Sequence, residues 1–292
     1  MTPRVSVIVA VRDGERHLGR CLEALLAQSW PRERLEIVVV DDASTDRTRE
    51  RASAFPVRVL ALPTAGGPYA ARNAGLRAAL GEILAFTDSD CVPAKDWVER
   101  ACAALHSEGA DLVAGHVRFA LGPGAGASGV VDALTNLDQQ RSVAERGVAK
   151  TGNLFATRRV FAAIGPFSER RSGGDVEWTA RASGAGFALV YAPDAVVEKT
   201  ARGAAALAAK QYRVGRGQVA LWRAAGEPAR AMLPRIARCF RPVRPALLRE
   251  RMRRRAPEGA RAGLARVWLA SWAMTAAQGL GRLHELVAGR PR

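Results

Sequence analysis

The first 120 residues alternate between short apolar runs rich in Val and Ile and segments in which apolar side chains recur at helical spacing. Continuous apolar runs are typical of strands buried on both faces, and apolar residues three and four apart predict amphipathic helices. The strands expected from this pattern are 5–11, 35–42, 57–62, 82–88 and 110–119. The helices expected between them are about 18–30, 44–54 and 95–107, and residues 66–81 are expected to form a loop that leads into a helix.

Strands that alternate with helices predict βαβ units and therefore an α/β domain with a mostly parallel sheet. Ligands of such sheets bind at the carboxyl ends of the strands. Asp41 and Asp42 fall at the carboxyl end of one expected strand, and Asp88 and Asp90 fall at that of another. We therefore expect a polar site at this edge of the sheet.

The rest of the chain is less regular. The segment GPGAGASG (122–129) is glycine-rich and is expected to form a flexible loop that covers the site. A helix over about 131–146, a strand near 151–156 and a helical turn over 158–164 are expected to follow. Residues 165–197 predict a loop, a helix and one or two strands, and an Arg-rich helical pattern begins at Ala201.

The charge distribution divides the chain. Residues 1–200 carry 24 Lys/Arg and 24 Asp/Glu, whereas residues 201–292 carry 20 Lys/Arg and 4 Glu, a net charge of +16. The whole excess charge therefore lies in the last third. This distribution predicts a catalytic domain over 1–200 and a basic helical region over 201–292.

Cysteine spacing and hydropathy indicate in which cellular compartment the protein is expected. The four cysteines show no CxxC spacing, so we expect free thiols in a reducing compartment. The longest uncharged run, Val267–Gly281, has 15 residues, whereas a spanning helix needs about 20 apolar ones. The N-terminus shows no signal-peptide pattern. A cytoplasmic location is expected, with attachment to the inner face of the cytoplasmic membrane left open.

Four segments occur in the order found in one enzyme family. They are VSVIVAVRDGERHLGRCLEALLAQSW, EIVVVDDASTDRT, GGPYAARNAGLRAALGEILAFTDSDCVP and GPFSERRSGGDVEWTARASGAGF. Together they resemble the inverting family 2 glycosyltransferases with a GT-A fold, over about residues 4–200. The resemblance implies sugar transfer from a nucleoside-diphosphate sugar, with UDP favoured, to a hydroxyl acceptor. A glycan, a lipid-linked molecule and a small molecule all stay open as acceptor.

Asp88 and Asp90 match the DxD motif of this family. A departing diphosphate is an anion, which Mg²⁺ or Mn²⁺ bound to carboxylate oxygens neutralises. The resemblance implies that Asp90 is the direct metal ligand and that Asp88 lies nearer the ribose or a metal-bound water. Ser89 between them is assigned to the nucleotide-sugar site.

The resemblance assigns further residues to the nucleotide side of this site. One of Asp41 and Asp42 is expected to accept a hydrogen bond from a ring N–H of the base. Arg72 is expected to meet the phosphate or the base. The remaining donor-side residues are Ala10, Val11, Arg12 and Asn73. The segment AVRDGE departs from the family, whose members often carry Pro and an aromatic–Asn pair there.

Asp175 aligns with the Asp of the family's Glu-Asp pair and is the expected general base. Gly174 stands where the family has Glu, which leaves Glu177 as an alternative acidic partner. Trp178 either stacks on an acceptor sugar or is a buried aromatic residue. Gly174, Glu177 and Trp178 are therefore grouped with the acceptor side of the site.

Two further segments bear on the site: one departs from the family, and the other, KQYRVGRG (210–217), resembles a basic stretch that follows the catalytic domain in some relatives. Many relatives carry a metal-site His after the last strand, whereas this chain has Glu198 and Lys199, of which Glu198 could bind a metal and Lys199 would replace a metal charge. Arg213 and Arg216 either touch the diphosphate or belong to the Arg-rich face.

The Arg-rich region suits an anionic membrane surface, because Arg occurs there with Trp and Leu. Specific nucleic-acid binding is not expected, since no nucleic-acid-binding motif is present. The alternative functions are a nucleotide-binding protein without turnover, nucleic-acid binding through the basic region, and a nucleotidyltransferase. The last would normally show a Gly-rich phosphate loop, which AVRDGERH is not.

Overall fold

The computed structural model describes residues 3–122, 125–170, 172–257 and 259–288. The chain forms two compact units. The first unit contains residues 1–118 and 137–199, and the second contains 119–136 and 200–292. The segment 119–136 therefore belongs with the basic C-terminal region, although its sequence position suggested the catalytic domain.

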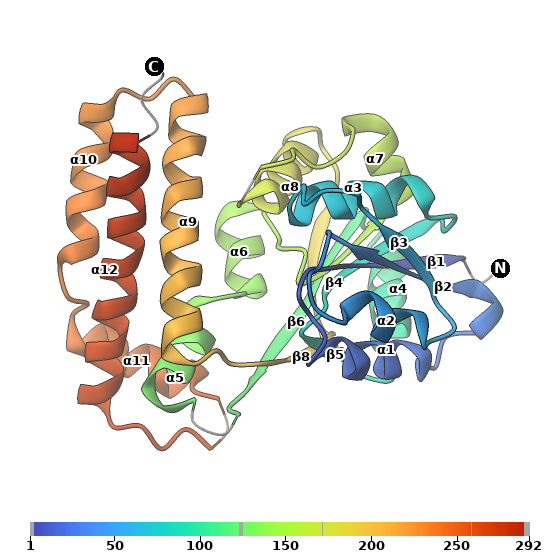
Figure 1. The fold of residues 1–292 in the computed structure, drawn as a ribbon, viewed down its shortest axis with the longest axis horizontal. Coiled ribbons are helices and arrows are strands. Elements are labelled where there is room, and N and C mark those ends of the chain that lie inside the picture. The colour runs from blue at the N-terminus through green and yellow to red at the C-terminus, as the bar shows by residue number, and fades with distance from the viewer. Residues whose placement is uncertain (1–2, 123–124, 171, 258, 289–292) are drawn as a thin grey trace. The chain divides into compact units, whose positions relative to one another are not determined.

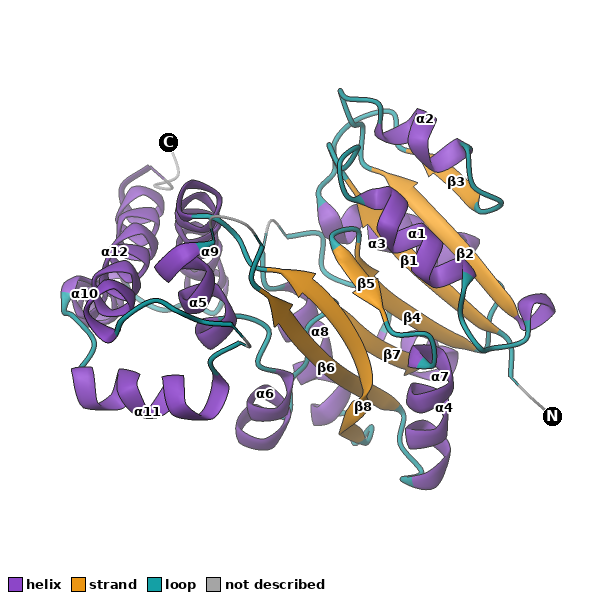
Figure 2. Ribbon diagram, turned by 90° about the horizontal axis from the view of Figure 1, so that it is seen from below, coloured by secondary structure: helices purple, strands orange, loops and turns teal. Residues whose placement is uncertain are grey.

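The sheet has eight strands in the order β3-β2-β1-β4-β7-β6-β8-β5 (Figure 2). Their bounds are β1 Val5–Val11, β2 Leu35–Asp41, β3 Arg58–Ala61, β4 Ile83–Asp88, β5 Cys91–Pro93, β6 Leu112–Ala120, β7 Asn153–Thr157 and β8 Leu189–Thr200. Strands β1 to β4 are parallel neighbours, as the alternating pattern predicts. The pairs β4–β7, β6–β7 and β5–β8 are antiparallel. The expected α/β class is thus confirmed, with an antiparallel half added to the parallel one.

Helices cover both faces of this sheet. The helices of the first unit are α1 Leu18–Leu26, α2 Thr48–Ser53, α3 Pro68–Ala78, α4 Trp97–Ser107, α6 Gln139–Arg146, α7 Arg158–Ile164 and α8 Gly174–Gly184, with a 3-10 helix at Arg32–Arg34. Figure 1 shows α3, α7 and α8 on one face and α1, α2 and α4 on the other. This arrangement leaves the carboxyl ends of β1, β2 and β4 for a site.

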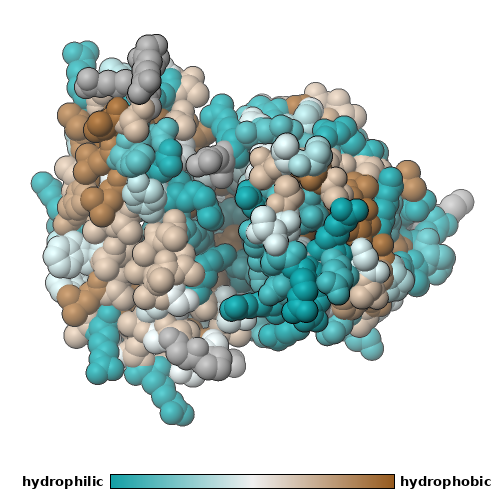
Figure 3. Space-filling view, in the orientation of Figure 1, coloured by the Kyte–Doolittle hydropathy of each residue, from teal (hydrophilic) through white to brown (hydrophobic). Residues whose placement is uncertain are grey.

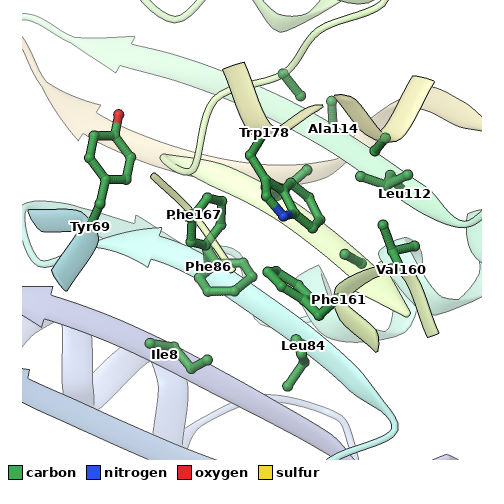
Figure 4. Close-up of a cluster of buried hydrophobic side chains, with 14 of the residues drawn as sticks. Ile8, Tyr69, Leu84, Phe86, Leu112, Ala114, Val160, Phe161, Phe167 and Trp178 are labelled. Carbon is green, nitrogen blue, oxygen red and sulfur yellow. The ribbon is translucent and has the colours of Figure 1, made fainter. Parts of the chain in front are cut away.

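An aromatic cluster fills the core between the sheet and α3, α7 and α8 (Figure 4). Trp178 stacks on Phe161 at 4.2 Å between ring centroids, and Phe86 meets Phe167 edge-on at 5.3 Å. The Trp178 ring is fully buried, and its Nε1 donates to the carbonyl of Gly165. Of the two alternatives for Trp178, a buried aromatic residue is therefore the one that the structure supports. Its ring does not face an acceptor sugar.

The single helix expected over 131–146 is two helices, α5 (Gly126–Thr135) and α6. Leu137 has a positive φ of 49°, and the carboxylate of Asp138 then accepts from the N–H of Arg141 and caps α6. The break coincides with the boundary between the units. Of the expected loop 122–129, residues 123–124 lie outside the described residues, and 126–129 begin α5.

The second unit is helical, as the Arg-rich pattern indicates. Its other helices are α9 Ala204–Ala224, α10 Ala229–Ala237, α11 Pro245–Arg255 and α12 Leu264–Ala288, with a 3-10 helix at Arg238–Phe240. Helices α9 and α12 lie side by side in both ribbon views (Figures 1 and 2). A Cβ at Gly215 would lie 2.1 Å from the carbonyl oxygen of Gln278, and one at Gly281 would lie 2.0 Å from that of Tyr212. Glycine is thus what permits this close contact.

Replacing Gly215 by Ala is expected to lower the free energy of unfolding by about 1–3 kcal/mol, because the added methyl group must push two helix backbones apart. Chemical denaturation of the full chain measures the change. Gly184→Ala is the matched control, since a Cβ there meets nothing within 4 Å. An equal loss of stability in both variants would show that the α9–α12 contact is not the cause.

The second unit also carries most of the exposed apolar surface. Among the described residues, seven of the eight exposed large apolar side chains belong to it: Leu233, Phe240, Leu247, Leu269, Trp272, Leu280 and Val287. Figure 3 shows hydrophobic residues on the surface of α10 and α12. No helix in the described ranges is both long enough and apolar enough to cross a membrane.

Candidate active site

The parallel register brings the predicted acidic residues to one edge. Val11 pairs with Asp41 on one side of β1, and Ala10 pairs with Asp88 on the other. The ends of three neighbouring strands thus place these two carboxylates on either side of the end of β1. Arg12 follows the strand, is exposed, and contacts Asp13 at 3.7 Å.

Asp88 and Asp90 form a compact charged cluster with two cations. Arg72 Nη2 donates to Asp88 Oδ1 at 2.9 Å, and Lys199 Nζ donates to Asp88 Oδ2 at 3.0 Å. The same ammonium also contacts Asp90 Oδ1. The two carboxylate side chains are 30% and 33% exposed, whereas that of Lys199 is 1% exposed. The acidic pair therefore faces solvent on one side and the buried cations on the other.

The donor atoms of this cluster fit a hard divalent cation. Oxygens of Asp88 and Asp90 and the Sγ of Cys91 lie within 4.8 Å of one another. Burial raises the pKa of Cys91 to about 12, so its thiol stays protonated at neutral pH. Carboxylate oxygens are the ligands that Mg²⁺ and Mn²⁺ prefer. Asp88 and Asp90, rather than Cys91, are thus the groups that would hold the metal.

Arg72 is buried on α3 behind this cluster. Only 6% of the residue is exposed, and its guanidinium carbon lies 5.4 Å from the ring centroid of Tyr69. Its Nε has no hydrogen-bond partner among the described residues. Buried donors normally have a partner, so Arg72 has unused capacity for an anionic or carbonyl group.

The two neighbouring acids at the end of β2 differ in their surroundings. Both are buried, but Asp42 accepts hydrogen bonds from the backbone N–H groups of Gly66 and Gly67 at 2.7 and 3.0 Å. Asp41 accepts from the N–H of Ser44 at 3.2 Å. Asp42 thus fixes the loop before α3, and Asp41 retains more acceptor capacity for a base.

Asn73 and Ser89 have partners within the protein. The side-chain amide of Asn73 donates to the Phe167 carbonyl at 2.9 Å and accepts from the Phe167 N–H at 3.1 Å. Because both ends of this buried amide are used, Asn73 holds the loop before α8 rather than facing a nucleotide. The Ser89 hydroxyl lies 3.2 Å from His17 Nε2.

Asp175, in the first turn of α8, is held by four hydrogen bonds. Its Oδ1 accepts from the Tyr69 hydroxyl at 2.7 Å and from the N–H of Val176 at 2.9 Å. Its Oδ2 accepts from the N–H and the hydroxyl of Thr151 at 3.1 and 3.3 Å. The Thr151 hydroxyl makes the longest of these bonds and can rotate away, so it is the one that an acceptor hydroxyl would replace.

Close packing explains why Gly174 stands where the family has Glu. A Cβ at Gly174 would lie 2.8 Å from the backbone oxygen of Ser168 and 3.0 Å from the Tyr69 ring, so glycine leaves room for both beside Asp175. Burial, and next the Asp175 carboxylate, raise the pKa of Tyr69 well above its ordinary value. Tyr69 therefore stays protonated and donates to Asp175. Figure 4 shows its hydroxyl directed away from the aromatic cluster.

Replacing Tyr69 by Phe is expected to lower kcat about tenfold, because Asp175 loses a donor that orients it while the ring stays packed. Steady-state nucleoside diphosphate release measures this effect. The Kd for the donor should stay within about twofold, since Tyr69 has no expected donor contact. Unchanged kcat would show that Tyr69 does not position the base.

The side chain of Glu177 contacts residues other than Asp175. Its carboxylate accepts from the hydroxyl of Ser168 at 2.8 Å and from Arg181 Nε at 2.7 Å. These contacts tie Glu177 to the outer part of α8 and to the preceding loop. The alternative in which Glu177 is a second acidic partner of the base has no support in the contacts of the described residues.

Two segments connect the Asp88–Asp90 cluster with Asp175. On α3, Tyr69 bonds Asp175 and Arg72 bonds Asp88. Before β7, Thr151 bonds Asp175, and a Cβ at Gly152 would lie 3.5 Å from Asp88 Oδ2. Asp175 and the Asp88–Asp90 cluster thus lie near the same two segments within the first unit.

Sequence reasoning missed Tyr69, Thr151 and Gly152. Tyr69 had a usable signal, because it precedes Arg72 by three residues and so shares its helix face. Thr151 and Gly152 had none, since the fold alone brings this turn to the site. Arg213 and Arg216 belong to α9 of the second unit, where Arg216 pairs with Glu285 at 2.8 Å.

Comparisons with known proteins identify the family. Residues 6–159 match the family model described as glycosyl transferase family 2. The glycosyltransferase AglE of Haloferax volcanii is 37% identical over 98% of this chain and 97% of its own length. The poly(ribitol-phosphate) β-N-acetylglucosaminyltransferase TarS of Staphylococcus aureus is 34% identical, over 38% of this chain and 20% of its own length.

Solved structures show the same fold. The mannosyltransferase PcManGT of Pyrobaculum calidifontis, in complex with GDP-Man and Mn²⁺, has a TM-score of 0.68 at 23% identity and covers 99% of this chain and 89% of its own. A TarS fragment in complex with UDP has a TM-score of 0.53 at 22% identity and covers 73% of this chain and 64% of its own.

Proposed function

The chain belongs to glycosyl transferase family 2, and from this premise we propose that the first unit transfers a sugar from a nucleoside-diphosphate sugar to a hydroxyl acceptor with inversion. The observation that carries the proposal is the pairing of a positioned base, Asp175, with the Asp88–Asp90 cluster in one site. The AglE likeness, which spans nearly the whole chain, supports a glycosyltransferase activity for the complete protein.

The proposed reaction is a single displacement. An acceptor hydroxyl replaces the Thr151 hydroxyl at Asp175 Oδ2 and gives its proton to that oxygen. The acceptor oxygen forms a bond to the anomeric carbon while the bond from this carbon to the diphosphate breaks. The bonding electron pair leaves with the nucleoside diphosphate. Because attack and departure lie on opposite sides of the carbon, the anomeric configuration inverts.

The Asp88–Asp90 end of the site receives the departing diphosphate. A Mg²⁺ or Mn²⁺ bound there supplies positive charge against the charge that develops on the leaving oxygen. Arg72 holds Asp88 in place and adds a positive charge at this end of the site. The solved Mn²⁺ complex of PcManGT supports a divalent metal as cofactor.

The base of the donor is proposed to be bound by Asp41. Uracil and guanine both carry a ring N–H that can donate a hydrogen bond to a carboxylate. Of the two similar structures, one contains UDP and the other contains GDP-Man. UDP-sugars are the first donors to test and GDP-sugars the second. Ala10 and Val11, at the end of β1 between the two acids, are proposed to lie beneath the nucleotide.

The product identifies the reaction. A panel of UDP- and GDP-sugars is incubated with the full chain, Mn²⁺ and a lipid extract, and the released nucleotide is analysed. The proposal predicts nucleoside diphosphate. Release of sugar 1-phosphate without nucleoside diphosphate would instead mean that the nucleotidyl group is transferred and that the P–O–P bond breaks, which would overturn it.

We further propose that the second unit binds an anionic membrane surface and so places the site near a lipid-linked acceptor. Its support is the combination of seven exposed large apolar side chains with the net charge of +16 over 201–292. The full chain should sediment with vesicles that contain anionic lipid and much less with zwitterionic ones. Equal recovery with both kinds of vesicle would contradict the electrostatic part of the proposal.

A further inference from the structure

Lys199 occupies an unusual place for a lysine. It lies on β8 and pairs in register with Cys91 on β5, directly beside the end of the DxD motif. The neighbouring Glu198 is half-buried and, since successive side chains of a strand point to opposite faces, it points to the other face of the sheet. Of the two residues that stand where relatives have a metal-site His, Lys199 is therefore the one that contacts the acidic pair.

The position of Lys199 requires the two carboxylates. Its side chain is 1% exposed, and the removal of an ammonium group from water costs several kcal/mol unless opposite charges and hydrogen bonds compensate. Asp88 and Asp90 provide that compensation, and Arg72 provides a second positive charge at Asp88. In this cluster, two carboxylates thus already contact two cations.

We propose that Lys199 is a tethered counter-cation that holds the carboxylate oxygens needed by a divalent metal, so that metal binds tightly only together with the nucleoside diphosphate. A metal alone would add two positive charges where the two carboxylates already contact two cations, and it would compete with the ammonium for Asp88 Oδ2 and Asp90 Oδ1. A diphosphate brings negative charge that offsets the added charge of the metal. This inference rests on the proposed function of the same site.

The inference assigns Lys199 a positioning role. Asp88 and Asp90 would repel each other as neighbouring anions, and in the absence of donor the Lys199 ammonium keeps them together. As a consequence, the site has a low affinity for free metal and binds metal when the donor is bound.

Mn²⁺ binding without nucleotide tests this role directly. Free Mn²⁺ is measured by electron paramagnetic resonance while Mn²⁺ is added to the full chain and to the Lys199→Met variant. We expect the Kd for Mn²⁺ to fall at least about tenfold in the variant, because the competing ammonium group is gone. Met is chosen because its apolar side chain is similar in length to that of Lys. Lys95→Met is the matched control, since it removes an exposed lysine of the first unit and should leave the Kd unchanged.

Two further arms keep the test decisive if Lys199→Met does not fold. Lys199→Arg retains the charge and should keep weak Mn²⁺ binding, whereas Lys199→Gln loses the charge and should bind Mn²⁺ more tightly. The wild-type protein alone is also informative. A wild-type Kd for Mn²⁺ below about 10 µM without nucleotide would overturn the inference whatever the variants do.

The outcome separates this inference from the proposed function. If wild type binds nucleoside diphosphate with Mn²⁺, but Lys199→Met shows an unchanged or higher Kd for Mn²⁺ alone, the counter-cation role is wrong and the transferase site stands. If no nucleoside diphosphate binds with or without Mn²⁺, the proposed function itself fails.

Discussion

Replacement of Asp175 by Asn is expected to lower kcat by about 10²–10⁴-fold, because the amide cannot accept the proton of the acceptor hydroxyl. The substitution keeps the size of the side chain, so the Tyr69 hydroxyl can still donate to its oxygen. Donor binding should change little, since Asp88, Asp90 and Arg72 are untouched. The measurement is nucleoside diphosphate release with saturating donor, together with calorimetric binding of the nucleoside diphosphate.

Glu177→Gln is the matched control for this variant. It changes a carboxylate to an amide on the same helix, two residues away, at a side chain that contacts Ser168 and Arg181. Its kcat should stay within about threefold of wild type. If Asp175→Asn keeps wild-type kcat, or if Glu177→Gln loses as much, Asp175 is not the base.

Replacement of Asp88 by Asn is expected both to abolish metal-dependent donor binding and to destabilise the first unit by about 3 kcal/mol. The stability loss arises because Arg72 and Lys199, both buried, each lose a charged partner. The value is at the lower end of the range for breaking a buried ion pair, since the Asp88 side chain is itself 30% exposed and Asp90 still contacts Lys199. Denaturation in urea without metal measures the loss.

Asp96→Asn is the control for the stability loss. Asp96 pairs with Arg100 one helical turn away, and both side chains are largely exposed, at 41% and 55%. Removal of that pair should cost less than about 1 kcal/mol. Similar losses in the two variants would mean that Asp88 is not the centre of a buried charge cluster.

The sequence predicted much of the first unit because its signals are local. Continuous Val and Ile runs such as 5–11 and 35–41 become the central parallel strands, and acidic residues at their ends meet at the predicted edge. The helix break before α6 was missed because no Gly or Pro marks it, while the structure ends α5 and caps α6 with Asp138. The strand β5 was missed because it has only three residues.

The site was predicted less completely than the fold. Asp88, Asp90, Arg72 and Asp175 were recognised from motifs, and the structure brings them into one site. The full burial of Trp178 and the pairing of Asn73 with the backbone of Phe167 could not be predicted, because neither leaves a trace in the local sequence. The contact of Lys199 with both DxD residues joins positions more than one hundred residues apart, so only the fold reveals it.

The most direct test of the central claim is calorimetric titration of the wild-type chain with UDP, GDP and dTDP, each with and without Mn²⁺. The account predicts that at least one of these nucleotides binds at least about tenfold more tightly when Mn²⁺ is present, because diphosphate and metal share the Asp88–Asp90 end of the site. Absence of binding for all three nucleotides in the presence of Mn²⁺ would contradict the assignment of this edge of the sheet as a nucleotide-sugar site.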